Sequence, residues 1–162
     1  MLAWRRRGRH EDPTMTMSLQ DLSDRQEIQD LMVAYCYAID RKRWDDLDEV
    51  FTPDAIIDYT EMVGFRGNLS ETKAFLVQGL AQLAAYQHSI STSSVRIEGD
   101  TAHGRTLCFN PMVIEVNGAK QTMFVGLWYR DTFVRTSKGW RIRERYEERC
   151  FTHNVPPGLL PE

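Results

Sequence analysis

The sequence predicts an α+β domain in which helices precede a long antiparallel sheet. In the first half of the chain, apolar residues recur at helical spacing, whereas after Gln87 apolar and polar residues alternate as they do in strands. The 162 residues show no internal repeat and no linker that would divide them, so the length suits one domain with one core. A chain of this kind packs its helices on one face of a strongly curved sheet, which leaves a pocket between the two layers.

The helical half contains three predicted helices and a short strand. The stretch SLQDLSDRQEIQDLMVAYCYAIDRKR (18–43) predicts a first helix, with Ser23 or Asp24 as its N-cap. A short second helix is expected over residues 44–51, ended by TPD (52–54). AIIDY (55–59) is typical of a strand, and a third helix is predicted from residue 69 to about residue 85.

The second half predicts four strands, within residues 88–100, 101–118, 120–139 and 140–151. Asn117 and Gly118 form a strong hairpin signal between the second and third of these strands. Pro111 cannot donate a backbone hydrogen bond, so its position inside a strand indicates an edge or a bulge.

Composition excludes several classes of function. The formal net charge of −3 argues against a nucleic-acid partner, and no apolar run approaches the ~20 residues that span a bilayer. The three cysteines lie in apolar stretches, which indicates buried free thiols, a reducing compartment and a cytoplasmic location. The four histidines lack metal-ligand spacing and no nucleotide-binding loop is present, so neither a metal nor a cofactor is expected.

The expected domain covers residues 18–155, with a leader (1–17) and a C-terminal tail (156–162) outside it. The leader has basic residues but no following apolar region, so it does not resemble a signal peptide. A disordered or partly ordered leader is expected, and a basic arm for an acidic partner is the alternative.

Asp40 is the most informative residue of the first helix. It continues the apolar row formed by Ile28, Met32 and Cys36, where a leucine would ordinarily pack. Burial and the negative end of the helix dipole both disfavour a carboxylate there, and both effects favour a base suited to proton abstraction. Alternatively, Asp40 only bonds Arg41, Arg43 or a loop amide at the helix end.

His88 is the one histidine placed to reach a core pocket. It precedes the alternating strand SISTSSVRIEG and follows the third helix. If the first helix crosses the mouth of the sheet, Asp40 and His88 meet, and the carboxylate fixes the imidazole tautomer and raises its basicity. A satisfied structural histidine is the alternative.

Tyr35, five residues before Asp40, is either a core aromatic residue or a donor to a substrate oxygen. Tyr59, Trp128 and Tyr129 carry the same ambiguity, and Cys108 and Asn110 share a strand face that could line the same pocket. The substrate-binding residues predicted for the pocket are Phe51, Tyr59, Leu76, Leu80, Thr92, Cys108, Asn110, Val125, Leu127 and Tyr129, with Phe109 and Phe124 as further candidates for the apolar wall.

Three stretches carry a resemblance to a known family: IQDLMVAYCYAIDRKRWDDLDEVFTPDA, QHSISTSSVRIEGDTAHGRT and YRDTFVRTSKGWRIRER. They resemble the SnoaL-like, scytalone dehydratase-like branch of the nuclear transport factor 2-like (NTF2-like) superfamily. The resemblance implies an α+β cone, a bent antiparallel sheet with three helices closing a deep apolar pocket. Similar enzymes include scytalone dehydratase, a bile-acid 7α-dehydratase and a hexachlorocyclohexane dehydrochlorinase, in which an Asp–His pair acts without a cofactor.

The resemblance assigns catalytic roles to Asp40, His88, Tyr35 and Arg149. The match of Arg149 rests on its place nine residues after Trp140. Arg149 has the opposite strand parity from Trp140 and Ile142, so it reaches the pocket only if a bulge interrupts the strand near residues 147–148. Scytalone dehydratase has a second pocket histidine on the next strand, where this chain offers Cys108 or Asn110.

Together these features predict a cofactor-free dehydratase or related lyase acting on a flat, apolar, oxygenated molecule of polyketide, steroid or terpenoid type. The alternatives are an isomerase of the ketosteroid-isomerase or polyketide-cyclase kind, and a non-catalytic small-molecule-binding protein, since the fold alone does not choose. Apolar residues on both faces of the meander also predict a homodimer or homotrimer formed through the sheet.

Overall fold

The computed structural model describes residues 16–161, which form an α+β cone. In chain order its elements are α1 (Leu19–Asp40), η1 (Trp44–Glu49), β1 (Phe51–Tyr59), α2 (Thr60–Val63), β2 (Phe65–Asn68), α3 (Leu69–Gly79), η2 (Leu80–Gln82), β3 (Leu83–Tyr86), β4 (Ser89–Glu98), β5 (Thr101–Val116), β6 (Ala119–Thr136) and β7 (Gly139–His153). The predicted fold class is confirmed, while most of the predicted leader, residues 1–15, lies outside the described residues.

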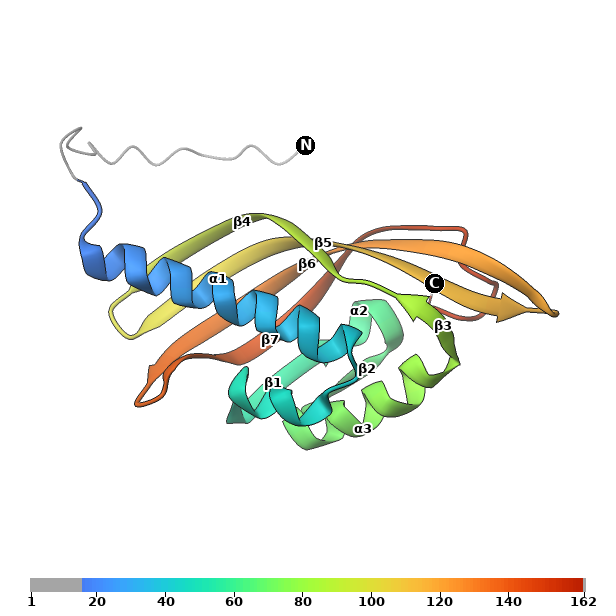
Figure 1. Cartoon of the computed structure of the whole chain (residues 1–162), viewed down its shortest axis with the longest axis horizontal. Coiled ribbons are helices and arrows are strands. Elements are labelled where there is room, and N and C mark those ends of the chain that lie inside the picture. Colours follow the sequence, from blue (N-terminus) through green and yellow to red (C-terminus); the bar gives the residue numbers. More distant parts are fainter. Residues whose placement is uncertain (1–15, 162) are drawn as a thin grey trace.

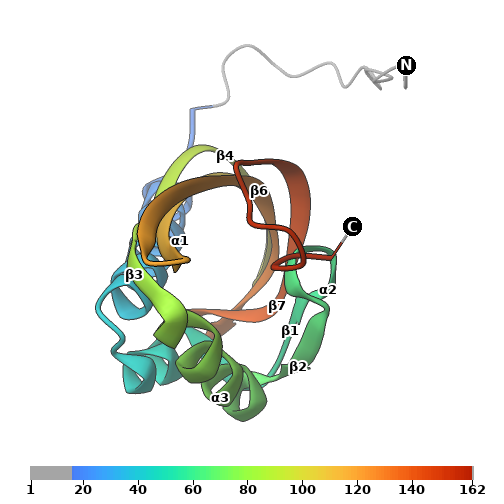
Figure 2. The same ribbon diagram turned by 90° about the vertical axis from the view of Figure 1, so that its right-hand side faces the viewer.

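The strands of residues 16–161 form one seven-stranded sheet in the order β2-β1-β7-β6-β5-β3, with β4 also paired to β5. The sheet curls strongly around its concave side, and α1 and α3 lie along one side of the curl (Figures 1 and 2). All pairings are antiparallel except β1 with β7, which is parallel. Pro111 lies where the partner of β5 changes from β4 to β3, so the ladder is already interrupted at the proline.

Helix α1 begins earlier than the sequence predicted. Ser18, not Ser23 or Asp24, is its N-cap, because Ser18 and Asp21 form a reciprocal capping box that stabilises the helix by about 1 kcal/mol. Asp24 is instead buried in the second turn, where its carboxylate accepts hydrogen bonds from Arg135 at 2.6 and 2.7 Å and from the indole of Trp140. These bonds anchor α1 to β6 and β7, and Arg135 holds the pKa of Asp24 well below its usual range.

The apolar row of α1 is buried as predicted, and its members pack into the concave side of the sheet. They are Ile28, Leu31, Met32, Tyr35, Cys36, Ala38 and Ile39. Burying each larger side chain of this row stabilises the fold by roughly 1.5–3 kcal/mol. The helix ends after Asp40, because Lys42 adopts a left-handed backbone conformation with a φ of 56°.

Other expectations need correction. The predicted second helix is a 3₁₀-helix that ends at Glu49, and the strand β1 already begins at Phe51. The third helix stops at Gly79 rather than near residue 85, and the chain then turns into β3. Cys36 and Cys108 are buried free thiols, but Cys150 is exposed and lies at a second register shift between β6 and β7, where it has no partner residue on β6. None of the helices in residues 16–161 combines the length and apolar character needed to cross a bilayer.

Candidate active site

A cavity of about 340 Å³ lies between the concave face of the sheet and the helices. Most of its wall is apolar, and its polar lining consists of a few residues from different elements. Those residues are Tyr35 of α1, Tyr59 of β1, Gln82 of η2, His88 of the segment before β4, Asn110 of β5 and Glu147 of β7. An apolar cavity with a few convergent polar groups is the usual form of a small-molecule site.

Asp40 and His88 meet at this cavity. The Nδ1 atom of His88 lies 2.6 Å from the Oδ1 atom of Asp40, and the side chains are 8% and 20% exposed. The backbone N–H of His88 also donates to both carboxylate oxygens, at 3.2 and 3.1 Å. The imidazole lines the cavity, whereas the carboxylate lies behind it. Asp40 therefore fixes the ring and holds the proton on Nδ1, which leaves the lone pair on Nε2.

Asn110 is the partner of that second nitrogen. Its Nδ2 atom lies 3.0 Å from the Nε2 atom of His88, so the amide donates to the imidazole lone pair. The Oδ1 atom of Asn110 is buried and has no hydrogen-bond partner among residues 16–161. The three side chains form one chain from Asp40 through His88 to Asn110, and a ligand must displace the amide before Nε2 accepts its proton.

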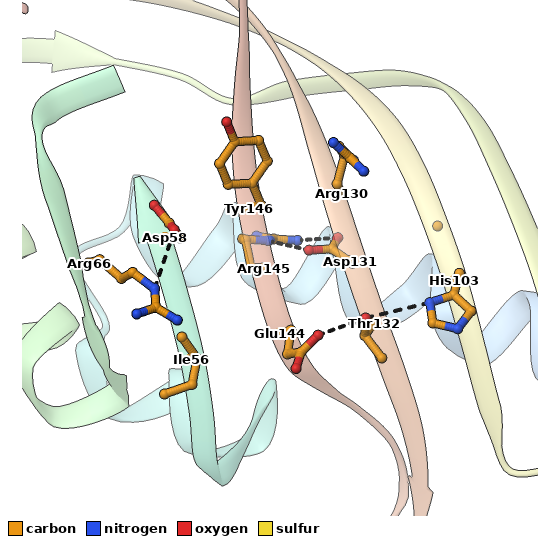
Figure 3. Close-up of a pocket in the computed structure, with 11 residues that line it drawn as sticks. Ile56, Asp58, Arg66, His103, Arg130, Asp131, Thr132, Glu144, Arg145 and Tyr146 are labelled. Atoms are coloured by element: carbon orange, nitrogen blue, oxygen red, sulfur yellow. Dashed lines mark hydrogen bonds and ion pairs between the residues drawn. The ribbon is translucent and has the colours of Figure 1, made fainter. Parts of the chain in front are cut away.

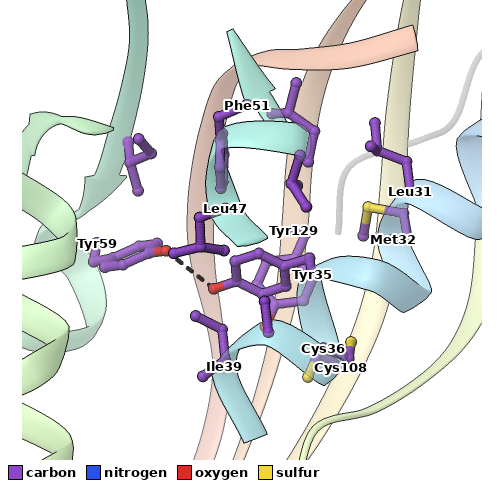
Figure 4. Close-up of a cluster of buried hydrophobic side chains, with 14 of the residues drawn as sticks. Leu31, Met32, Tyr35, Cys36, Ile39, Leu47, Phe51, Tyr59, Cys108 and Tyr129 are labelled. Carbon is purple, nitrogen blue, oxygen red and sulfur yellow. Dashed lines mark hydrogen bonds between the residues drawn. The ribbon is translucent and has the colours of Figure 1, made fainter. Parts of the chain in front are cut away.

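A second polar group is a pair of tyrosines. The hydroxyl oxygens of Tyr35 and Tyr59 lie 3.0 Å apart (Figure 4), and the Tyr35 and His88 rings are 6.2 Å apart between centroids. Burial raises the pKa of both phenols well above the usual value, so both keep their protons. One hydroxyl donates to the other, and one O–H of the pair is left to donate to a ligand.

Arg145 lies beneath the tyrosines as a fully buried cation. Its guanidinium lies 4.0 Å from the ring centroids of both Tyr35 and Tyr129, which meet edge to face with 5.6 Å between their centroids. Asp131 accepts two hydrogen bonds from it, each of 2.8 Å. The carboxylate thus neutralises the buried charge, although the Nη1 atom of Arg145 has no hydrogen-bond partner among residues 16–161.

Glu147 lies two residues before Arg149 on β7, and strand parity did not predict its place in the cavity wall. The ladder between β6 and β7 shifts register between the pairs Thr132–Glu144 and Phe133–Ile142, so one extra residue of β7 is inserted at Arg143. Beyond this bulge the odd-numbered residues of β7 turn inward, which places Glu147 in the cavity wall. The sequence carries no signal that locates the bulge.

The bulge does not bring Arg149 into the cavity. Its backbone N–H donates to the Glu61 carboxylate at 2.8 Å, and its guanidinium donates to the Glu61 and Pro161 carbonyl oxygens. Arg149 thus ties α2 to the C-terminal segment, two residues of which, Leu159 and Leu160, line the cavity. The expected tail therefore lies against the domain and closes part of the cavity.

The predicted wall matches the structure in part. Tyr59, Leu76, Leu80, Asn110, Val125 and Leu127 line the cavity. Phe51, Cys108 and Tyr129 do not line it; they are almost fully buried in the core beneath it (Figure 4). Thr92 is exposed on β4, and Phe109 and Phe124 lie on the convex face, because strand parity turns them away from the helices. Burial raises the pKa of the Cys108 thiol to about 12, so it is no nucleophile at neutral pH.

A larger groove, of about 550 Å³, lies on the convex face of the sheet (Figure 3). Its lining is dominated by charged and polar side chains that bond one another, such as Arg66 with Asp58 and Thr132 with Glu144. His103 of this groove has only a long contact of 3.5 Å with Thr132. No base held by a carboxylate is present there, so the smaller concave cavity is the better candidate. Residues 16–161 contain no group of three or more His, Cys, Asp or Glu side chains that could hold a metal ion.

Comparisons with known proteins identify a family and a shared fold. A family model described as a SnoaL-like domain matches residues 20–146. An uncharacterized protein of Mycobacterium tuberculosis is 50% identical over 135 residues, which cover 83% of this chain and 91% of that protein.

Solved structures share the fold at lower identity. A candidate scytalone dehydratase from Novosphingobium aromaticivorans is 18% identical with a TM-score of 0.75, covering 86% of this chain and 93% of that one. Hexachlorocyclohexane dehydrochlorinase LinA-type3 from Novosphingobium barchaimii is 17% identical with a TM-score of 0.72, and the match covers 86% of this chain and 94% of that one. An NTF2-like superfamily protein from Salmonella enterica is 16% identical with a TM-score of 0.67, and the match covers 85% of this chain and 98% of that one.

Proposed function

The chain belongs to the SnoaL-like domain family, and from this premise we propose that it is a cofactor-independent lyase of the dehydratase type. The observation that carries the proposal is the His88 imidazole in the cavity wall, with Nδ1 held at 2.6 Å by Asp40. Two structural neighbours named for dehydration and dehydrochlorination support an elimination reaction.

The reaction begins with removal of a proton from a carbon beside a carbonyl group. Nε2 of His88 takes this proton once the ligand has displaced the Asn110 amide. Asp40 keeps the other proton on Nδ1 and stabilises the imidazolium that forms. Such positioned acid–base catalysis contributes roughly 10²–10⁴-fold.

The oxygen of the substrate gains negative charge as the proton leaves. The free O–H of the Tyr35–Tyr59 pair donates to that oxygen from a site where water is largely excluded. A buried donor of this kind contributes on the order of 10²–10³-fold. The imidazolium then returns its proton to the leaving hydroxyl group, so that water departs and a double bond forms.

The cavity selects the substrate class. Its wall combines aliphatic side chains from α3, β5 and β6 with aromatic side chains from α1 and α3. We propose a flat, largely apolar molecule with a carbonyl group, of polyketide, steroid or terpenoid type, because few polar groups line the space.

A second candidate function is small-molecule binding without chemistry. It is favoured by the backbone N–H of His88, which donates to both oxygens of Asp40 and gives the pair a structural role at the start of β4. An isomerase shares the first proton transfer with the lyase and differs in whether that proton returns to carbon.

The test uses 3-hydroxy-1-tetralone, a flat β-hydroxy ketone that loses water to give 1-naphthol. Purified protein should release 1-naphthol, detected by its fluorescence, and activity should persist after dialysis against EDTA. Deuterium exchange into the position beside the carbonyl of 1-tetralone, followed by NMR, detects proton abstraction alone and thus also reports an isomerase. If wild-type protein binds 1-tetralone but catalyses neither reaction, the binding candidate is favoured over the lyase.

A further inference from the structure

Glu147 is a buried carboxyl group in the cavity wall that the reaction above does not use. It is 9% exposed, lines the cavity, and pairs across the sheet with Tyr129. Among residues 16–161 no hydrogen bond or ion pair reaches its side chain, and its oxygens are not fully buried, so they are open to the cavity. A group left without a protein partner at a cavity surface is available to a ligand.

The charge nearest to Glu147 is already balanced. Arg145, two residues earlier on the same strand face, gives two hydrogen bonds to Asp131 and is enclosed by aromatic rings. An ionised Glu147 would therefore add an unbalanced negative charge to a largely apolar cavity. Burial without a counter-ion favours the neutral acid, and desolvation raises the pKa of Glu147 to about 8 although Arg145 opposes the rise.

The other titratable groups around Glu147 come from four neighbouring elements. They are Tyr35 of α1, Tyr59 of β1, Cys108 of β5, and Tyr129 and Asp131 of β6, in addition to Arg145 of β7 itself. His88, in the segment before β4, also lines the cavity. The phenols and the thiol are held neutral by burial. The only full charges in this set are Arg145 and Asp131, which neutralise each other.

Glu147 also lies close to the tyrosine pair. Tyr35, Tyr59 and Glu147 all line this cavity, and Glu147 pairs across the sheet with Tyr129, whose ring centroid lies 5.6 Å from that of Tyr35. A carboxylic acid and a phenol that converge on one point form a two-donor site for an oxygen atom, the arrangement that stabilises an enolate best.

We infer that Glu147 enters the cavity as a carboxylic acid and donates its O–H to the ligand oxygen that the Tyr35–Tyr59 pair also binds. The ligand is accordingly a neutral ketone or enone rather than a hydrocarbon or a basic amine. This role deepens the proposed function and rests on it for the reaction, but ligand recognition by Glu147 holds whether or not the ligand reacts.

Binding of a matched ligand pair tests the inference. 1-Tetralone and tetralin share a bicyclic skeleton, and only the ketone offers an acceptor oxygen. Glu147→Leu should weaken 1-tetralone binding by about 3–10-fold, the value of one neutral hydrogen bond, and should leave tetralin binding unchanged or improved. Glu147→Gln keeps a neutral donor of the same shape and should bind 1-tetralone nearly as well as wild type does.

The pH dependence of binding of the same two ligands shows whether the acid or the anion of Glu147 recognises the ketone. Between about pH 6 and about pH 9, the preference of wild type for 1-tetralone over tetralin should fall by about 3–10-fold, because Glu147 gives up its proton, while Glu147→Gln should keep its preference. Equal loss of ketone binding in the Gln and Leu variants would overturn the inference, since the anion would then be the functional form. Unchanged ketone binding in Glu147→Leu would overturn it as well.

A measurement without ligand covers the case in which neither probe binds. The side-chain carboxyl carbon of Glu147, assigned in ¹³C NMR spectra by its absence from Glu147→Gln, should titrate well above the other glutamates. Titration in the ordinary range of a carboxyl group would refute the neutral acid. His88→Gln should leave this titration and the ketone preference intact, so failure of the proposed reaction and failure of the Glu147 assignment are distinguishable.

Discussion

The Nδ1 atom of His88 lies 2.6 Å from the Oδ1 atom of Asp40, although the two residues are 48 positions apart in the sequence. The helix end supplies the carboxylate and the start of β4 supplies the imidazole. Because the same carboxylate also accepts the backbone N–H of His88, the pair has a structural component in addition to its proposed chemical one. The two components respond differently to substitution.

His88→Gln should lower turnover of 3-hydroxy-1-tetralone by about 10²–10⁴-fold while 1-tetralone still binds. Asp40→Asn should also reduce turnover by orders of magnitude, because it favours the wrong tautomer of His88. The double variant should be hardly worse than the worse single variant, since residues that act as a unit are not additive.

Thermal stability of the same variants supplies the control for this pair. A purely structural pair predicts that both substitutions lower the melting temperature and that ligand binding falls only as folding fails. If His88→Gln folds stably and turns over at the wild-type rate, His88 is not the base.

Asn110 gives a second test of the base, because its amide bonds the nitrogen that must accept the proton. Asn110→Asp would place a carboxylate at each end of the imidazole, hold both ring nitrogens protonated and suppress proton abstraction by at least about 10-fold. Asn110→Ala removes the competing donor, and its rate of proton abstraction should fall less than that of Asn110→Asp. It is therefore the matched control. Deuterium exchange into 1-tetralone measures the step directly, and a faster rate in the Asp variant than in the Ala variant would contradict the proposed role of Nε2.

The tyrosine pair predicts an unusual pattern of substitutions. Tyr35→Phe and Tyr59→Phe each leave one hydroxyl in the cavity, and that hydroxyl no longer has a phenol partner to bond. The turnover of each single variant should therefore fall by less than the ~10²–10³-fold expected for a missing oxyanion donor. The turnover of the double variant should fall by the full amount. Kinetics of 1-naphthol release measure this; additive losses would show that the two hydroxyls act independently.

The sequence was sufficient to single out Asp40 and His88, whose side chains meet in the structure, because the signals are local. A carboxylate interrupts an apolar row at Asp40, and one histidine stands at the start of an alternating strand. Of the wall candidates on the third predicted strand, Val125 and Leu127 line the cavity, whereas Phe124 has the opposite parity and does not. These features depend on periodicity within one element, which tertiary structure rarely changes.

The features of the fold and of the cavity that the sequence did not predict depend on contacts between distant segments. A single inserted residue in β7 reverses the faces of the strand, so Glu147 enters the cavity and no sequence pattern marks the position. The parallel pairing of β1 with β7 is a long-range contact that the order of elements does not specify. The early end of α3 reflects competition between helix and the pairing of β3 with β5 for the same residues.

Glu147 also predicts how stability varies with pH. Its pKa is about 8 in the folded protein, against the ordinary 4.5 of a glutamate in the unfolded chain. Because the folded state holds the proton more tightly, the stabilisation is present below about pH 4.5 and is lost as the pH rises to about 8. Across that window wild type should lose about 1.4 kcal/mol per pH unit relative to Glu147→Gln, which cannot titrate. Urea unfolding of both proteins at several pH values measures the difference, and a constant difference would contradict a raised pKa.

The convex face of the sheet carries exposed aromatic residues, and we propose that it joins two or three copies of the chain. Phe109 and Phe151 are 40% and 48% exposed, and Phe109 stacks on Phe124 with 5.6 Å between ring centroids. Exposed apolar patches of this kind commonly mark interfaces. Phe109→Lys should raise the dissociation constant at least about 10-fold, because symmetry brings like charges together, while the concave cavity keeps its turnover. Val77→Lys, at a 47% exposed apolar residue of α3, is the matched control and should leave assembly unchanged. Sedimentation velocity at micromolar concentration measures both variants, and a wild-type protein that is only monomeric there would refute this interface.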